Sequence, residues 1–197
     1  MLGIFSLIVL LFSLVLHEVS HGWVALSLGD TTAKDAGRLT LNPIKHLDLF
    51  GSILFPLFLY WMGSPVLFGW AKPVPVNPYN LRDPKWGIFK VSLAGPAANF
   101  LVAIFFGLLI RVVPLPVNLL PFLAEIVGIN LLWGFFNLVP IPPLDGGQIL
   151  FSLLPDRFSE LKTRLYRYGP IILLLFIVFG FGILNRLVSL IFNLLIG

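Results

Sequence analysis

The chain of 197 residues contains no cysteine and few charged side chains. Without cysteine it can form neither disulfide bonds nor a thiolate metal site. Charged residues make up 11% of the chain, whereas soluble domains have about 25%. A chain that is 58% hydrophobic, with a mean hydropathy of +0.98, has too few polar groups to cover a surface in water. The lipid bilayer is therefore its expected solvent, and we predict an all-α polytopic membrane protein in which residues 1–197 form a single domain.

Five apolar blocks divide the sequence. They cover residues 2–29, 49–71, 91–110, about 119–144 and about 168–197. The first block, about 42 Å long as a helix, exceeds the ~30 Å hydrocarbon core. It has no positively charged start and no cleavage signal, so we expect a retained helix rather than a signal peptide. The second block is interrupted by Pro56, Gly63, Pro65 and Gly69. We therefore predict four full spans plus a re-entrant or partial helical element at 49–71, with a full fifth or sixth span as the alternative.

The positive charges are concentrated in three loops. Residues 30–48, 72–90 and 156–167 hold 11 of the 13 lysines and arginines. By the positive-inside rule these loops share the cytoplasmic side, which places the N-terminus outside. Residues 38–41 alternate in polarity, and the prolines in residues 72–76 exclude a helix there. We expect short β-strands in both segments, at the cytoplasmic interface.

The first block contains the sequence HEVSH, with His17, Glu18 and His21. The two histidines are four residues apart and lie on one helical face, where they can bind one Zn²⁺ with Glu18 as general base. In a soluble helix, solvated surface residues would be the favoured interpretation. Three ionisable groups within a membrane span need a common partner, however, and a cation supplies one.

A catalytic zinc site usually has a third protein ligand. The candidates are Asp145, Glu125, His46 and Asp48. His17 lies roughly 22 Å along the helix from its outer end, so the site is nearer the cytoplasmic face. Asp145 lies at the matching end of the fourth block and is favoured, whereas Glu125 lies near the outer end. For His46 and Asp48 a solvated loop is the favoured interpretation.

The sequence around Asp145 supports this choice. In NLVPIPPLDGGQ, residues 137–148, three prolines interrupt the helix and two glycines permit a tight turn. The simpler alternative is a helix break in which Asp145 caps a short helix from Gly146 to Leu154. Capping and metal binding can coexist.

With HEVSH in the first helix and NLVPIPPLDGG in a later one, the chain resembles the site-2 protease family of intramembrane zinc metalloproteases. Two further stretches agree: SLAGPAANF at 92–100 and GWAKPVPVN at 69–77. The resemblance runs from His17 to Gln148, about two thirds of the chain. It resembles the minimal class, because there is no room for an added PDZ or CBS domain.

The resemblance implies that His17, His21 and Asp145 bind Zn²⁺, that Glu18 activates water, and that Asn137 lies near the bound substrate backbone. For Asn137 a helix-packing hydrogen bond is an equal alternative, and Asn99 has the same alternative with weaker functional support. Gly95 and Pro96 are interpreted as permitting close packing of the third helix on the first.

The predicted function is hydrolysis of peptide bonds in or near the transmembrane segment of single-span membrane proteins. The predicted partners are that segment and the lipid bilayer, in a prokaryotic cell membrane with the site toward the cytoplasm, and nucleic acid is not expected. A metal transporter would repeat its ligands along a pathway, and an inactive helix-binding relative would have lost Glu18 or a ligand. The sequence shows neither feature.

Overall fold

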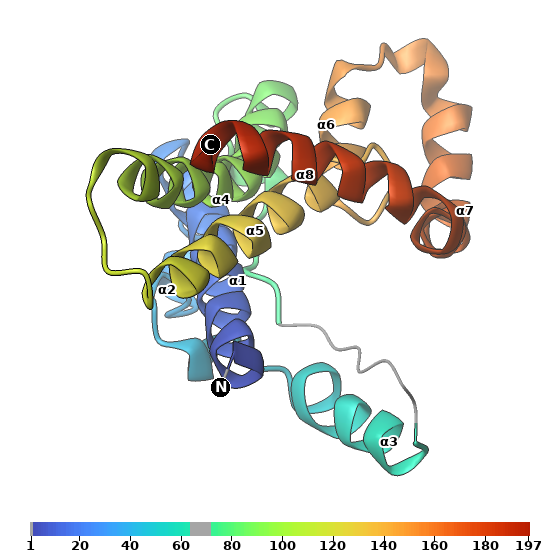
Figure 1. Cartoon of the computed structure of the whole chain (residues 1–197). Coiled ribbons are helices and arrows are strands. Elements are labelled where there is room, and N and C mark those ends of the chain that lie inside the picture. The colour runs from blue at the N-terminus through green and yellow to red at the C-terminus, as the bar shows by residue number, and fades with distance from the viewer. Residues whose placement is uncertain (1, 64–71) are drawn as a thin grey trace.

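The computed structural model describes residues 2–63 and 72–197 (Figure 1). The α-helices are α1 (Leu2–Ser27), α2 (Thr32–Asp35), α3 (Phe55–Trp61), α4 (Pro84–Val112), α5 (Leu120–Asn137), α6 (Asp145–Leu153), α7 (Ser159–Leu175) and α8 (Phe181–Ile196). The 3₁₀-helices are η1 (Pro43–His46), η3 (Pro78–Asn80) and η4 (Asp156–Phe158), and the π-helices are η2 (Leu49–Leu54) and η5 (Phe176–Gly180). Within the described residues all regular secondary structure is helical.

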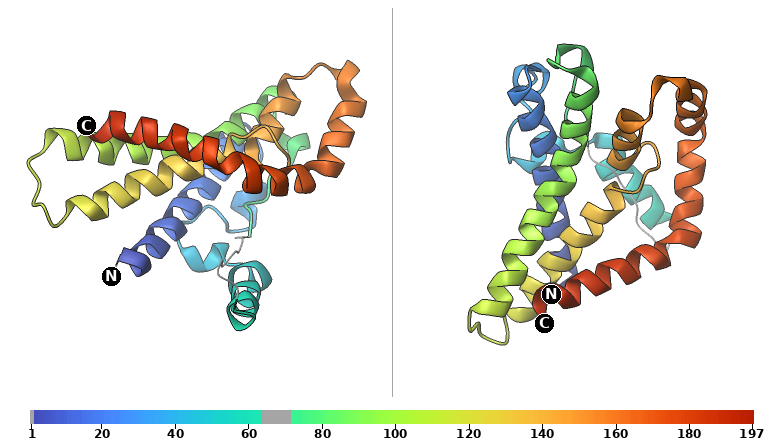
Figure 2. Two further views of the ribbon diagram at one scale, coloured as in Figure 1. Left: turned by 45° about the vertical axis from the view of Figure 1, so that its right-hand side comes forward. Right: turned by 90° about the horizontal axis from the view of Figure 1, so that it is seen from above.

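Four helices are long and apolar enough to cross a membrane, as predicted. They comprise Gly3–Ser27, Pro84–Val112, Leu120–Asn137 and the continuous helical stretch Ser159–Ile196. The last one begins within the predicted basic loop, where Glu160 and Arg164 pair one turn apart. A π-helix joins α7 to α8, and α7 stands away from α1 and α4 in the second view of Figure 2.

The core of the molecule forms where α4, α5 and α8 meet. Its buried side chains are Ala103, Val127, Leu131, Leu184 and Val188. Helix α4 packs against α1, α5, α6 and α8. A second, smaller cluster of Ala25, Leu81 and Val91 joins the end of α1 to the start of α4. Helix α4 therefore fixes the C-terminal end of the site-bearing helix α1, whereas Ser6 near the other end of α1 donates to Glu125 of α5.

The second apolar block is a partial element in the part that the structure describes. Residues 49–61 form η2 followed by α3, and 13 helical residues are too few to cross a bilayer. Residues 64–71 lie outside the described residues. The residues that flank this block lie side by side, because the Lys72 N–H donates to the His46 carbonyl at 2.9 Å. In Figure 1 α3 lies apart from the other helices.

The prediction of short β-strands is wrong. Residues 38–41 and 72–76 are both described, and neither forms a strand. Two prolines in the second segment, Pro73 and Pro75, have no N–H to donate to a ladder. The segments are joined instead by a side chain, because Arg38 Nη2 donates to the Lys72 carbonyl at 2.7 Å and lies 3.4 Å from that of Pro73.

Candidate metal centre

Helix α1 places His17, Glu18 and His21 together near its C-terminal end. The histidines lie one turn apart, with ring centroids 4.7 Å apart and the rings almost perpendicular. Both imidazoles are buried, with 3% and 8% of His17 and His21 exposed. Glu18 is half-buried and points into a cavity of about 390 Å³ that both histidines also line.

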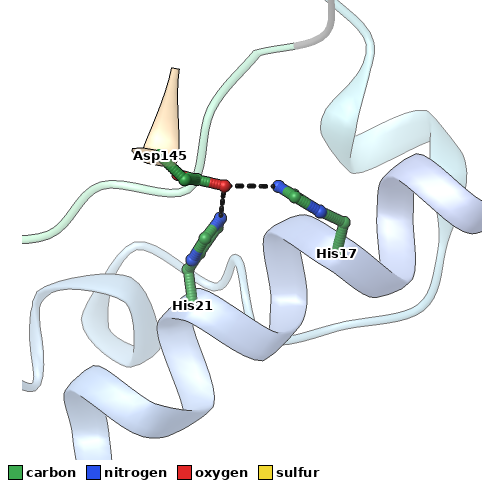
Figure 3. A group of neighbouring side chains, drawn as sticks. All are labelled: His17, His21 and Asp145. Carbon is green, nitrogen blue, oxygen red and sulfur yellow. Dashed lines mark ion pairs between the residues drawn. The ribbon is translucent and has the colours of Figure 1, made fainter. Parts of the chain in front are cut away.

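Asp145 reaches the same point from the first turn of α6 (Figure 3). Its Oδ2 lies 3.0 Å from His17 Nε2 and 3.4 Å from His21 Nε2. The three ligand atoms lie within 4.8 Å of one another. The N-cap of α6 is Leu144 and Asp145 is the first residue of the helix, so Asp145 is not the capping residue. Its Oδ2 is directed at the two histidines.

Asp145 can reach this position because the backbone at Gly146 and Gly147 packs directly against the loop that follows α5. A Cβ on Gly147 would come within 2.7 Å of the Pro142 nitrogen, and one on Gly146 would overlap the backbone at Leu138. The prolines at 140, 142 and 143 end α5. The loop therefore folds back tightly and returns the carboxylate to the depth of the two histidines.

The hydrogen bonds of the two imidazoles determine what their inner nitrogens offer. His21 Nδ1 donates to the Val91 carbonyl at 2.7 Å, and His17 Nδ1 lies 2.7 Å from Asn99 Oδ1. A neutral imidazole that donates through Nδ1 presents a lone pair at Nε2. Asp145 Oδ2 is buried and has no hydrogen-bond donor. Three lone-pair atoms thus converge on one point, an arrangement that fits a divalent cation.

Gly95 provides the space in front of the imidazoles. A Cβ at this position would lie 2.5 Å from His21 Nε2 and 2.6 Å from His17 Nε2. The sequence predicted that Gly95 permits close packing of the two helices, and α4 does pack on α1. The atoms that need the space are the ligand nitrogens themselves.

The extended segment of residues 72–76 holds Glu18 in place. The Val74 N–H donates to Glu18 Oε2 at 2.9 Å, and Pro73, Val74 and Val76 line the cavity. Opposite Glu18, Gln148 and Leu144 also line the cavity. A carboxylate beside three convergent lone-pair atoms can accept a proton from a water molecule bound there.

Asn137 lies at the same cavity, at the C-terminal end of α5. Its side chain is 9% exposed, and its Nδ2 donates to the Trp133 carbonyl at 3.0 Å within its own helix. One N–H is therefore used in the helix, and the residue still borders the space beside Asp145.

The other candidate ligands lie elsewhere. Glu125 accepts a hydrogen bond of 2.6 Å from Ser6, near the opposite end of α1. Asp48 accepts one from the Gly51 N–H at 2.6 Å and caps η2. His46 is 1% exposed and bonds to the Thr40 carbonyl at 2.8 Å, so the expectation of a solvated loop residue is wrong. None of the three joins the group formed by His17, His21 and Asp145.

Sequence reasoning undervalued two polar residues. Asn99 is fully buried in α4 and contacts His17. The sequence feature that could have indicated this contact is an amide within a membrane span. Asp30 is fully buried after α1 and accepts hydrogen bonds from Thr32, Asn77 and Asn80. Nothing in the local pattern distinguished Asp30 from a loop carboxylate, because two of its three donor residues, Asn77 and Asn80, lie 47 and 50 residues away.

Two histidines and a carboxylate converge inside a bundle of membrane-spanning helices. This combination of fold and site is that of a membrane-embedded metalloprotein. The family model described as peptidase family M50 matches residues 113–180. The matched segment carries Asn137 and Asp145, while His17 and His21 precede it.

Several relatives are named zinc metalloproteases. The putative zinc metalloprotease YwhC of Bacillus subtilis is 38% identical over 187 residues, 90% of this chain and 82% of the relative. The putative zinc metalloprotease Rip2 of Mycolicibacterium smegmatis is 30% identical over 181 residues, 89% of this chain and 68% of the relative. The zinc metalloprotease MJ0392 of Methanocaldococcus jannaschii is 28% identical over 93% of this chain, which spans about half of that relative's length. No solved structure matches the chain.

The chain belongs to peptidase family M50, the site-2 protease family. It is therefore a zinc metalloprotease of the membrane, and Zn²⁺ is its cofactor. The donor set found here, two imidazole nitrogens and one carboxylate oxygen, is a set that zinc enzymes use.

Proposed function

We propose that this protein is an intramembrane endopeptidase that cleaves single-span membrane proteins in or near their transmembrane segment. The observation that carries the proposal is the convergence of two Nε2 atoms and Asp145 Oδ2 beside Glu18, at one cavity inside a membrane-spanning bundle. His17, His21 and Asp145 hold the zinc ion. Residues 1–197 act as one protease unit.

When bound, zinc supplies Lewis acidity, which makes a water molecule more acidic and polarises a peptide carbonyl. Glu18 is the general base, and it passes the proton on to the leaving amine. The Val74 N–H occupies Oε2, so Oε1 receives the proton. This hydrogen bond fixes the carboxylate in the rotamer that faces the cavity.

Asn137 orients the substrate backbone. It lies at the cavity beside Asp145, and one of its amide N–H groups is used within α5. The amide oxygen and the second N–H are the groups offered to a substrate peptide, whose N–H and C=O are freed when a transmembrane helix unwinds.

The N-terminus lies outside and the site faces the cytoplasm of a prokaryotic cell. Support comes from the three basic loops, which mark the cytoplasmic side, and from relatives in bacteria and an archaeon. Water reaches Glu18 from that side through the cavity.

The test compares wild-type protein with Glu18→Gln, in detergent and in liposomes. Zinc content is measured together with cleavage of a single-span test substrate. The expected result is full zinc occupancy in both forms and a loss of cleavage on the order of 10²–10⁴-fold in Glu18→Gln. His17→Ala loses zinc as well as cleavage.

Glu125→Gln is the matched control. It also replaces a membrane-embedded carboxylate on a packed helix, and Gln retains an acceptor for Ser6. It should keep both zinc and cleavage. Equal cleavage by wild type and Glu18→Gln, or no cleavage by a fully zinc-loaded wild type, contradicts the protease. The second outcome is the result expected of a metal transporter or an inactive helix-binding protein.

A further inference from the structure

Two asparagines are fully buried within membrane-spanning helices. Asn99 in α4 is 0% exposed and Asn130 in α5 is 1% exposed. An amide at such a depth needs hydrogen-bond partners, because neither lipid nor water supplies them. The partners of these two amides form one continuous chain of hydrogen bonds that crosses from α5 through α4 to α1.

The orientation of each amide follows from a backbone carbonyl. Asn130 Nδ2 donates to the Ile126 carbonyl at 2.9 Å, and a carbonyl can only accept. Asn130 Oδ1 is therefore the atom that faces Asn99 and accepts from Asn99 Nδ2 at 3.0 Å. The same Nδ2 also donates to the Ser13 carbonyl at 3.2 Å. Two acceptors thus hold the amino end of the Asn99 amide.

The amide oxygen of Asn99 must then face His17, 2.7 Å from Nδ1. Because this oxygen can only accept, His17 Nδ1 carries the proton and Nε2 presents its lone pair toward Asp145. His21 reaches the same tautomer differently, through the Val91 carbonyl of the main chain. A main-chain carbonyl cannot flip, whereas a side-chain amide can, so the chain of hydrogen bonds matters for His17 alone.

We infer that Asn99, held in orientation by Asn130 and the Ser13 carbonyl, is a positioning residue that fixes His17 as its Nδ1–H tautomer and thereby sets the affinity for zinc. The inference rests on the proposed function, in which His17 binds zinc. Partners of this kind raise the basicity of a ligating histidine and orient its ring, and their loss costs roughly 10- to 100-fold in metal affinity.

The competing explanation is helix packing alone. Hydrogen bonds between membrane helices stabilise their association, and a purely structural Asn99 would affect stability without selecting a tautomer. A readout that reports the tautomer separates the two explanations.

The first experiment records ¹⁵N NMR of the imidazoles in metal-free, detergent-solubilised protein, at a pH where the rings are neutral. The chain has three histidines, so single His17→Ala and His46→Ala variants assign every signal. Wild-type His17 should show a protonated Nδ1 and a bare Nε2. In Asn99→Leu, which removes the acceptor at similar volume, the His17 signals should move toward a mixture of tautomers, while those of His21 remain unchanged.

The second experiment measures zinc affinity by competition with a chelator. Asn99→Leu should bind zinc roughly 10- to 100-fold more weakly than wild type. Asn99→Asp, as a neutral carboxyl, keeps a donor for the Ser13 and Asn130 oxygens as well as an oxygen facing His17 Nδ1, so it should keep the Nδ1–H tautomer and bind zinc within a few-fold of wild type. Ser13→Ala is the matched control, because it removes a buried hydroxyl on α1 and leaves the carbonyl that Asn99 uses.

The inference is overturned if Asn99→Leu keeps the wild-type tautomer and zinc affinity. If Asn99→Leu does not fold, Asn99→Asp decides, because a mixture of His17 tautomers despite the retained oxygen overturns the inference, and a retained Nδ1–H tautomer with near-wild-type zinc affinity supports it. Failure of the proposed zinc site gives a different result, since wild-type protein would then bind no zinc at His17, His21 and Asp145, whatever residue stands at position 99. Failure of the protease activity alone would appear as a zinc-loaded wild type that does not cleave the test substrate.

Discussion

The main-chain N–H of Val74 donates a hydrogen bond of 2.9 Å to Oε2 of Glu18, across 56 residues of sequence. Pro73 and Pro75 flank Val74, and the residue before a proline is restricted to extended conformations. The donor is therefore presented by a stiff segment. Through it the loop before α4 fixes the direction of a carboxylate on α1.

Val74→Pro removes this donor with little change in the path of the chain. Because hydrogen bonds to charged groups contribute about 1.5–3 kcal/mol, we expect cleavage to fall by roughly 10- to 100-fold with zinc content unchanged. Val74→Ala is the control, since it loses the side chain and keeps the N–H. Equal losses in both variants would mean that the side chain of Val74, and not its N–H, is what matters.

Arg38 holds the same segment from the other side. It is buried, and its Nη2 donates to the Lys72 carbonyl at 2.7 Å. Lysine keeps the charge but lacks the planar fork, so Arg38→Lys should speed hydrogen exchange at the Val74 amide and lower cleavage. Arg82→Lys, at an exposed arginine just after η3, should change neither the hydrogen exchange at Val74 nor cleavage. Unaltered hydrogen exchange at the Val74 amide in Arg38→Lys would contradict the role of Arg38 in holding this segment.

Gly95→Ala places a methyl group between the two imidazoles. Its Cβ would lie 2.5–2.6 Å from the Nε2 atoms of His21 and His17, so the rings must move apart. We expect zinc affinity to fall by about 10- to 100-fold or more, measured as metal content after dialysis. Gly128→Ala is the control on α5, where the nearest atom to the added Cβ lies at 3.8 Å; it should retain zinc. Full zinc content in Gly95→Ala would show that the rings do not need this space.

Asp30 should make stability depend on pH. Burial alone would raise the pKa of Asp30, but hydrogen bonds from Thr32, Asn80 and Asn77 outweigh burial and lower the pKa below its ordinary value of 3.8. The stabilisation by the ionised form is therefore complete above that pH, and it is lost as the pH falls through the lowered pKa of the folded state.

The measurement is the melting temperature of wild type and Asp30→Asn in detergent at a series of pH values. Near neutrality the variant should melt a few degrees lower, given about 1.5–3 kcal/mol for charged hydrogen bonds and about 2–4 °C per kcal/mol at this size. The difference should shrink below about pH 3.8. Asp35→Asn, at an exposed carboxylate, should show no such difference. A gap that widens on acidification would contradict the sign of the pKa shift.

The solvent, the number of long apolar helices and the identity of the converging residues can all be read from local sequence patterns. Transfer energies require some twenty apolar residues per span, and that signal is local. The spacing in HEVSH places His17 and His21 on one face whatever the tertiary structure. In the structure Asp145, and not Glu125, lies beside them, which agrees with the depth counted along each helix.

The surroundings of His17, His21 and Asp145 depend on how the helices pack. The rotation of α4 about its axis directs Asn99 at His17 and Gly95 at both ligand nitrogens, and no local pattern fixes such a rotation. The loops were misjudged for the same reason. Residues 38–41 and 72–76 do not form the predicted strands, and the buried guanidinium of Arg38 joins the two segments instead. Side-chain hydrogen bonds between distant segments depend on how helices cross, and a linear sequence does not specify this.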